Sequence, residues 1–448
     1  MRKQPGFNSG YNRRPGRENG LAAVWPVFNS RSPPLLILIE KNYNISYSPE
    51  PKKNFPSPLL FEPFSVRLTA VIPVLLHWGL FMKIDFHRTA LAEALGLVNT
   101  VIVSRTPKAI LKSVRLSTAD NIVRLAATDL EVALSCSISE VDILEAGETV
   151  LPADRLSAIV RESAEDVLHM VVEADKCRIR GRDSNFLIYT QDPSLFPPVP
   201  LFEGPADMEI ELDTLQAGVE QCLFATAKES TRYAINGVLW QAKGRKLIFV
   251  ATDGRRLARS RVALKKDAGR EGELEYIVPT KAMTLLDRLD GQKKQTVSVR
   301  FVDNRLLIGC GKVDISSNLV EGNFPKYEDI IPVDYEKKLT LPTEPVLSAV
   351  RRASLLTSEE SRGVKISLST GSLVFSSRTP ETGDAQVTME VDYKGEPVDI
   401  SFSPQFLIDA LRVMKTTDFT LELSQSDRPG LLKSGADFLY VLMPINLG

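Results

Sequence analysis

Residues 231–261 read TRYAINGVLWQAKGRKLIFVATDGRRLARSR, a stretch that predicts three short antiparallel strands. The first strand is expected at 237–241 and the second at 247–252, with a tight turn at 242–246 between them. Asp253-Gly254 predicts the turn into a third strand from Arg255, because glycine adopts a positive φ cheaply and aspartate can bond its own backbone. Strands joined by such short turns are typical of β-hairpins.

The three-strand pattern recurs on both sides of this stretch. Upstream, strands are expected at 113–117, 122–127 and 132–138, and downstream at 363–368, 373–377 and 385–391. Thr128-Asp129 and Thr252-Asp253 each follow an alanine and lie 124 residues apart. Phe196-Pro197 and Phe324-Pro325 lie 128 residues apart and close the first two copies. Such self-similarity indicates a repeated structural unit.

Helices recur in step with the strands. One helix is expected before each trio, at 88–98, 213–228 and 343–356, and another after it, at 153–161, 280–289 and 405–415. Pro152, Pro279 and Pro404 stand at the start of the second helices, where the missing N–H of proline has no intrahelical partner. Phe406, Leu407, Ala410, Leu411 and Met414 form an apolar stripe on the last of them.

This order of elements predicts an α+β fold. We expect three repeated domains, each an antiparallel sheet with two helices on one face, because the strands are grouped rather than alternated with helices. The expected boundaries are 82–206, 207–335 and 336–448.

Residues 1–81 differ from the rest of the chain. They hold ten Lys/Arg and four Asp/Glu, a net charge of +6, so residues 82–448 carry −7 of the total of −1. Residues 1–58 are rich in Pro, Asn, Ser and Arg, a composition typical of disorder. The apolar run 68–82 is short for a membrane span. One interpretation is a non-native extension with translation starting at Met82, and the other is a genuine tail that tethers or targets.

Composition limits the chemistry that the chain can perform. The sequence is 43% apolar and 25% charged, as in an ordinary globular protein. Its four cysteines have no paired spacing, which indicates buried or inert thiols in a reducing compartment. Three histidines give little support for metal or acid–base chemistry, and no metal or cofactor is expected. No P-loop, nucleophile elbow or zinc-protease motif is present, so no catalytic residue is predicted.

Basic side chains fall on the expected helices and at their ends. They include Arg105, Arg155, Arg161, Lys281 and Arg351. Each could line a solvated helix face. The alternative is a phosphate-facing surface repeated three times, and the acidic character of the rest of residues 82–448 favours it.

Several motifs follow one another across essentially all of residues 82–448: Met82-Lys83-Ile84, Ser104-Arg105-Thr106, Ala109-Ile110-Leu111, Arg232-Tyr233-Ala234-Ile235-Asn236-Gly237, Val250 to Ala258, Phe324-Pro325-x-Tyr327 and Met443-Pro444-Ile445-x-Leu447. In this order they resemble the beta-subunit family of bacterial DNA polymerase III, the sliding clamps. The resemblance implies a cytoplasmic processivity factor without catalytic activity of its own. It implies a head-to-tail homodimer that closes a ring around duplex DNA, with Arg105 and Tyr233 as the better DNA-facing candidates.

The resemblance also implies a cleft between the second and third domains. There the polymerase III alpha subunit, clamp-loader subunits and repair proteins would dock short apolar motifs. Carried over residue by residue, the cleft comprises Thr252, Gly254, Arg256, Leu257, Pro325, Ile330, Phe406, Val441, Met443, Pro444 and Ile445. We expect an apolar groove with an arginine rim, although each residue could instead serve ordinary strand packing.

Three positions depart from the family pattern. Ala234 stands where some members carry a second tyrosine, Arg255 where histidine is common, and Asp329 where some members have a basic residue. Two rival functions remain: an enzyme on an α+β scaffold, and a ring-shaped repeat protein that scaffolds only protein partners.

Overall fold

The computed structural model describes residues 81–103, 105–228, 233–267, 273–289, 291, 294–357, 363–380 and 383–445. The expectations for the upstream segment, and for Leu447, lie outside the described residues. No helix in the described ranges is long and apolar enough to cross a membrane.

The order of elements follows the predicted repeat. The first copy contains β1 (Phe81–His87), α1 (Arg88–Asn99), η1 (Ala109–Lys112), β2 (Ser113–Ala119), β3 (Ile122–Thr128), β4 (Val132–Ile138), β5 (Val141–Glu145), β6 (Glu148–Pro152), α2 (Ala153–Glu162), β7 (Val167–Glu173), β8 (Lys176–Arg180), β9 (Asn185–Tyr189) and η2 (Pro193–Leu195).

The second copy, as far as it is described, repeats this order without a counterpart of β5. It contains β10 (Met208–Glu211), α3 (Leu212–Leu223), η3 (Tyr233–Asn236), β11 (Gly237–Lys243), β12 (Lys246–Thr252), β13 (Arg256–Ala263), β14 (Leu274–Pro279), α4 (Thr280–Asp287), β15 (Thr296–Val302), β16 (Arg305–Cys310), β17 (Val313–Asn318) and η4 (Tyr327–Ile330).

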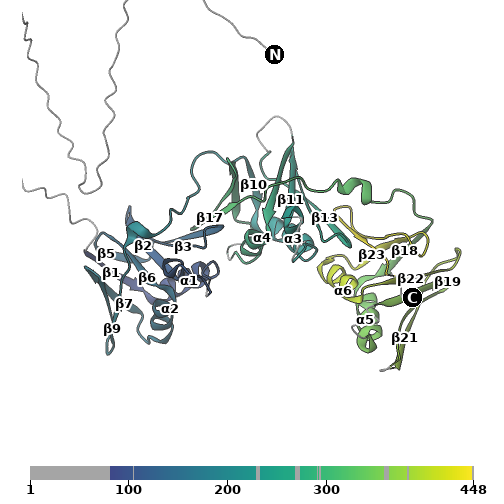
Figure 1. The fold of residues 1–448 in the computed structure, drawn as a ribbon, viewed down its shortest axis with the longest axis horizontal. Helices are drawn as coiled ribbons and strands as arrows, with labels where there is room; N and C mark the ends of the chain where they lie inside the picture. The colour runs from purple at the N-terminus through teal and green to yellow at the C-terminus, as the bar shows by residue number, and fades with distance from the viewer. Residues whose placement is uncertain are drawn as a thin grey trace, which may run out of the picture. The chain divides into compact units, whose positions relative to one another are not determined.

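The third copy does the same. It contains β18 (Lys337–Pro342), α5 (Thr343–Ala353), η5 (Ser354–Leu356), β19 (Val364–Ser369), β20 (Ser372–Thr379), β21 (Gly383–Glu390), β22 (Val398–Phe402), α6 (Pro404–Val413), β23 (Asp418–Leu423), β24 (Gly430–Ser434) and β25 (Phe438–Leu442). In each copy the two α-helices pack together, as α1 with α2, α3 with α4 and α5 with α6 (Figure 1).

Two helices end three or more residues earlier than predicted. α3 ends at Leu223 rather than at residue 228, and the N–H of Ala227 donates to the carbonyl of Ile235 instead of continuing the helical ladder. α5 ends at Ala353, and its last turn tightens into the 3₁₀ helix η5. Apolar periodicity alone does not distinguish these segments from helix, because their residues are still partly buried.

Of the four sheets in the described residues, two cross from one repeat into the next, which the sequence did not indicate. One eight-stranded sheet has the order β10-β15-β16-β17-β4-β3-β2-β6, and the other β14-β11-β12-β13-β25-β24-β23-β18. In both, the third strand of one repeat's trio pairs with the last strand of the next repeat, as β4 with β17 and β13 with β25. A five-stranded sheet, β5-β1-β7-β8-β9, and a four-stranded sheet, β21-β20-β19-β22, complete the fold.

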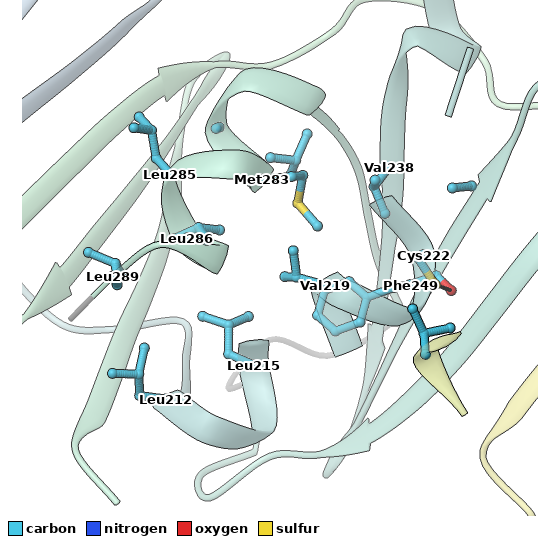
Figure 2. Close-up of a cluster of buried hydrophobic side chains, with 14 of the residues drawn as sticks. Leu212, Leu215, Val219, Cys222, Val238, Phe249, Met283, Leu285, Leu286 and Leu289 are labelled. Carbon is cyan, nitrogen blue, oxygen red and sulfur yellow. Dashed lines mark hydrogen bonds between the residues drawn. The ribbon is translucent and has the colours of Figure 1, made fainter. Parts of the chain in front are cut away.

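The apolar core lies between the helices and the sheets. In the middle repeat Leu215 and Val219 of α3 point toward Met283 of α4 and Phe249 of β12 (Figure 2). Trp240 is buried beneath them, and its indole N–H lies 3.2 Å from the sulfur of Met283. The four cysteines are buried and unpaired, as predicted, and burial raises the pKa of Cys136 to about 11 and that of Cys177 to about 12.

Candidate functional site

The turn between β12 and β13 is held by side chains that bond their own backbone. Thr252 Oγ1 donates to the carbonyl of Arg256 at 2.7 Å and accepts from the N–H of Gly254 at 3.1 Å. Asp253 Oδ1 accepts from the N–H groups of Arg255 and Arg256, at 2.9 and 3.1 Å. Gly254 has a φ of +86° and open space where a Cβ would stand. The turn therefore exposes a bare backbone surface at the edge of β13.

The strand after this turn pairs with the last strand of the chain. Leu257 on β13 lies opposite Val441 on β25, and the N–H of Met443 donates to the carbonyl of Arg255 at 2.9 Å. Leu257 and Val441 belong to a separate apolar cluster that also includes Phe324 and Tyr327 from the connection between the second and third repeats. These side chains form a buried apolar floor beside Pro325.

The remaining residues expected in the cleft are more exposed. Ile330 is 42% exposed and Met443 39%, while Pro325, Phe406, Pro444 and Ile445 are half-buried. The N–H of Ile445 donates to the carbonyl of Ser401 at 2.8 Å, which attaches the C-terminal segment to the edge strand β22. Exposed Met and Ile side chains beside a buried apolar floor suit the docking of an apolar peptide side chain.

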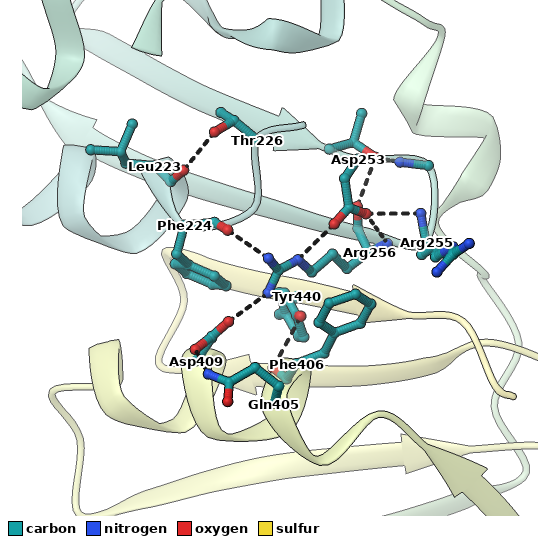
Figure 3. Close-up of polar contacts among 12 residues, drawn as sticks. Leu223, Phe224, Thr226, Asp253, Arg255, Arg256, Gln405, Phe406, Asp409 and Tyr440 are labelled. Atoms are coloured by element: carbon teal, nitrogen blue, oxygen red, sulfur yellow. Dashed lines mark hydrogen bonds and ion pairs between the residues drawn. The ribbon is translucent and has the colours of Figure 1, made fainter. Parts of the chain in front are cut away.

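Arg256 corrects one expectation about this site. It is only 8% exposed, so it does not form an accessible rim. Its guanidinium lies 3.0 Å from Asp253 Oδ2 and 2.8 Å from Asp409 Oδ2, and it donates to the carbonyl of Phe224 at 2.7 Å (Figure 3). It also stacks 4.1 Å from the centre of the Phe406 ring. Leu257, the next residue, faces the opposite side of the sheet, because successive strand side chains alternate.

The electrostatics of Arg256 fit this buried position. Desolvation acts to lower the pKa of Arg256, but the hydrogen bond to Asp409, with Tyr440 and Asp253 nearby, raises it overall. The side chain thus stays charged while it joins β13 to α6 of the third repeat. Sequence reasoning missed Asp409 and Phe224 as its partners, because Asp409 is 153 residues away in the chain and no local pattern marks it.

The candidate DNA-facing residues occupy different environments. Arg105 and Arg351 are exposed. The side chains of Arg155 and Arg161 on α2 are each 76% exposed beside acidic neighbours. The side chain of Tyr233 lies outside the described residues.

Lys281 differs from the other candidates. On α4, it forms an ion pair with Asp129 in the β3–β4 turn and lies 3.7 Å from Glu131. Its charge is therefore partly neutralised at the junction between the first and second repeats. Within the described ranges, no group of three or more His, Cys, Asp or Glu side chains could hold a metal ion.

Comparison with known proteins agrees with this architecture. Family models of the DNA polymerase III beta subunit match three consecutive segments: the N-terminal domain over residues 82–200, the central domain over 209–326 and the C-terminal domain over 328–446. The chain is 31% identical over 369 residues to the beta sliding clamp of Pseudomonas putida and 28% identical over 369 residues to that of Vibrio cholerae. Each alignment covers 82% of this chain and 100% of the relative.

Solved structures give the same result. The DNA polymerase sliding clamp of Bacillus subtilis superposes with a TM-score of 0.78 at 27% identity, over 82% of this chain and 99% of that one. The beta subunit of DNA polymerase III from Pseudomonas aeruginosa does so with a TM-score of 0.76 at 30% identity, over 82% of this chain and all of that one. The chain therefore belongs to the DNA polymerase III beta-subunit family, and its function is that of a DNA sliding clamp.

Proposed function

We propose that two copies of the chain join head to tail into a closed ring around duplex DNA, in the cytoplasm, and tether the replicative polymerase. In this proposal residues 82–206, 207–335 and 336–448 are three clamp domains, and the chain has no catalytic centre of its own. Partners dock on the cleft between the second and third domains. The observation that carries the ring is the strand pairing at the two junctions within the chain.

Each internal junction pairs strands from the same two positions of the repeat. The third strand of a trio, β4 or β13, pairs antiparallel with the last strand of the following repeat, β17 or β25. The strands in the corresponding positions at the two ends of the repeat array are β21 and β9, and both are edge strands. Unpaired edges are protected when they pair with another chain. Pairing β21 of one copy with β9 of the next, twice, closes a ring of two chains.

The internal junctions also predict the register at the junction between subunits. Asp384 of β21 corresponds to Leu257 of β13. In each of these strands one residue lies opposite the first residue of the preceding strand, and Asp384 and Leu257 each lie six residues before that residue. The β7–β8 and β15–β16 turns have the same length, so Phe186 of β9 corresponds to Ile315 of β17. Ala385 is therefore expected opposite Phe186 of the partner subunit, with Gln386 opposite Asn185 of the partner subunit.

Apolar contacts support the same pairing. At the internal junction Phe224, just after α3, packs on Tyr440 of β25 with ring centres 5.7 Å apart. Leu355, just after α5, holds the position equivalent to Phe224 and is 77% exposed. Beside the β9 edge, a pocket of about 370 Å³ is lined by α2 and by residues 186–189. We expect Leu355 to enter this pocket on the partner subunit.

A ring requires little affinity for DNA. Retention on a closed duplex is topological, and weak contacts that do not depend on sequence let the ring slide. Arg105, Arg155, Arg161 and Arg351 are proposed to supply such contacts, with Tyr233 from the η3 segment. Lys281 is proposed to contribute less, since Asp129 already pairs with it.

The cleft is proposed to bind short apolar motifs from the polymerase alpha subunit, clamp-loader subunits and repair proteins. The buried pair Leu257 and Val441 would form its floor, and Met443 and Ile330 its exposed walls. Gly254 would let a peptide backbone lie across the turn. Deleting residues 443–447 should abolish binding of a polymerase-tail peptide while the dimer remains intact, and an unchanged affinity would contradict this assignment.

A disulfide test addresses the ring directly. Asn185 and Gln386 are both exposed and are expected opposite each other across the subunit junction, within the distance a disulfide spans. The Asn185→Cys, Gln386→Cys double variant should form a cross-linked dimer on mild oxidation, and the buried native thiols should not compete. Asn185→Cys with Val387→Cys is the control, because Val387 faces the other side of the sheet. Equal cross-linking in both variants, or in neither, would contradict the proposed pairing.

A further inference from the structure

The junction between the first and second repeats carries a turn built like the one at the partner cleft. Thr128 Oγ1 donates to the carbonyl of Val132 at 3.0 Å and accepts from the N–H of Leu130 at 3.0 Å. Asp129 Oδ1 accepts from the N–H groups of Glu131 and Val132, at 3.0 and 2.8 Å. These bonds match, atom for atom, those of the β12–β13 turn, so Leu130 occupies the place of Gly254.

The strands beyond the two turns also correspond. Ala133 lies opposite Ser316 as Leu257 lies opposite Val441. The N–H of Asn318 donates to the carbonyl of Glu131 at 2.9 Å, as the N–H of Met443 donates to that of Arg255. The first junction therefore reproduces the backbone of the cleft with smaller and more polar side chains on its floor.

This junction holds a pocket of about 120 Å³. Its lining contains the counterparts of seven proposed cleft residues, namely Thr128, Leu130, Val132, Ala133, Pro197, Ser316 and Asn318. Arg305 and two further prolines also contribute to the wall. Because the pocket arises at the equivalent place by the same strand geometry, it is the structural counterpart of the peptide cleft.

Leu130 is unusual at this position. Its φ of +81° lies in the left-handed region, which is strained for a leucine, and its side chain is nevertheless 46% exposed. The carbonyl of Leu130 accepts a hydrogen bond from Asn318 Nδ2 at 3.3 Å, which helps to hold this conformation. A strained backbone that presents an apolar side chain at the mouth of a pocket is a feature of binding sites.

The charges of the pocket define what it can bind. Arg305 is exposed and, in the described part of the chain, forms no ion pair. Glu131 also lines the pocket, but Lys281 lies 3.7 Å from its carboxylate and offsets its charge. A carboxylate is therefore the complementary group for Arg305, while Leu130 and Pro197 offer apolar contact.

We propose that this pocket binds an extended peptide segment of a protein partner that presents a carboxylate next to an apolar side chain. The carboxylate pairs with Arg305 and the apolar side chain lies against Leu130. The clamp would then hold two peptide sites of different chemistry in each chain. This inference rests on the proposed partner cleft, because the equivalence to that cleft is part of its support.

Environment-sensitive fluorophores on engineered cysteines test the proposal in the full-length protein. Asn304→Cys places one label beside Arg305, and Lys326→Cys places another beside the partner cleft, in separate preparations. The four native thiols are buried and should not be labelled. The probes are acetyl-Leu-Asp-Leu-amide and its neutral counterpart acetyl-Leu-Asn-Leu-amide.

The label at position 304 should respond saturably to the Asp peptide and more weakly to the Asn peptide. Arg305→Gln should lower the affinity for the Asp peptide about tenfold and remove the preference for the Asp peptide over the Asn peptide. Met443→Ala should change only the response at position 326. No saturation at position 304, or equal affinity in Arg305→Gln, would overturn the proposal even if the label at position 326 still reports peptide binding. Loss of the response at position 326 alone would instead count against the proposed cleft.

Discussion

Arg256 and Asp409 join the second repeat to the third: Nη1 of the guanidinium lies 2.8 Å from Oδ2 of the carboxylate, with only 8% and 18% of the two side chains exposed. The same arginine bonds Asp253 in the cleft turn and stacks on Phe406. One side chain therefore fixes both the turn that borders the proposed cleft and the helix beside it.

Replacing Arg256 should destabilise the chain strongly. Arg256→Ala leaves Asp253 and Asp409 poorly exposed without their cation, which is expected to cost about 3 kcal/mol of unfolding free energy. The unfolding free energy of Arg256→Lys should lie between those of the parent and Arg256→Ala, because lysine keeps the charge but lacks the planar guanidinium. Urea unfolding followed by circular dichroism measures the change. Arg255→Ala, at the exposed neighbouring position, is the control and should stay within about 0.5 kcal/mol of the parent.

Gly254→Ala should separate folding from partner binding. The positive φ predicts a loss of about 1 kcal/mol, and no neighbouring atom lies within 4 Å of the new Cβ to add to it. The methyl group would stand where the partner peptide is proposed to cross, so peptide affinity should fall beyond what stability explains. Gly371→Ala is the matched control, because Gly371 has a φ of +75° and similar open space in a remote turn. If both variants bind a polymerase-tail peptide equally well, the proposed path of the peptide is wrong.

Leu355→Lys should convert the dimer to a monomer. Leu355 is 77% exposed in the single chain, so the substitution should leave the fold of the chain unchanged within about 0.5 kcal/mol. A lysine placed in the apolar pocket beside β9 of the partner subunit would be desolvated without a partner. Native mass spectrometry reads the oligomeric state. Val333→Lys is the control, since Val333 is 92% exposed and lies away from the proposed junction, and it should remain dimeric.

Arg161 and Lys281 should differ in their effect on DNA binding. If Arg161 contacts a phosphate, Arg161→Gln should reduce the slope of log affinity against log salt concentration by about one unit. Lys281→Gln should leave that slope nearly unchanged and instead destabilise the chain by about 1 kcal/mol, because it deprives the poorly exposed Asp129 of its partner. Fluorescence anisotropy on short duplexes at several salt concentrations measures both. Equal slopes for Arg161→Gln and the parent would remove Arg161 from the DNA-facing set.

Local sequence patterns predicted the helices and the three strands of each trio, but neither the strands on either side of the trios nor the way the elements assemble. The turn residues Thr252, Asp253 and Gly254 could be identified because their hydrogen bonds are made within four residues of chain. The pairing of β13 with β25 could not, since strands that contact across such a separation leave no periodic signal. The same limit applies to Arg256, whose expected place on an accessible rim was wrong because Asp409 and Phe406 come from α6 and the carbonyl of Phe224 comes from the residue after α3.

The resemblance to the family identified candidate site residues that periodicity alone could not identify. Proposed cleft residues such as Leu257 and Val441 look like ordinary strand residues in the sequence, and only the motif order set them apart. The fold then shows that they share one apolar cluster with Tyr327, while Arg256 lies on the other face of the sheet. The pocket at the first junction had no sequence signal beyond the repeated Ala-Thr-Asp, because its character depends on Leu130, Arg305 and Asn318 meeting in the fold.

Retention on DNA tests the ring most directly. The protein is loaded onto a nicked circular plasmid by a clamp loader, and half of the sample is then linearised with a restriction enzyme before gel filtration in high salt. A closed ring predicts that the protein stays with the circle, where weak phosphate contacts are screened but topology is not, and that it leaves the linear DNA through its ends. Equal loss from circular and linear DNA would contradict the ring and the sliding that depends on it.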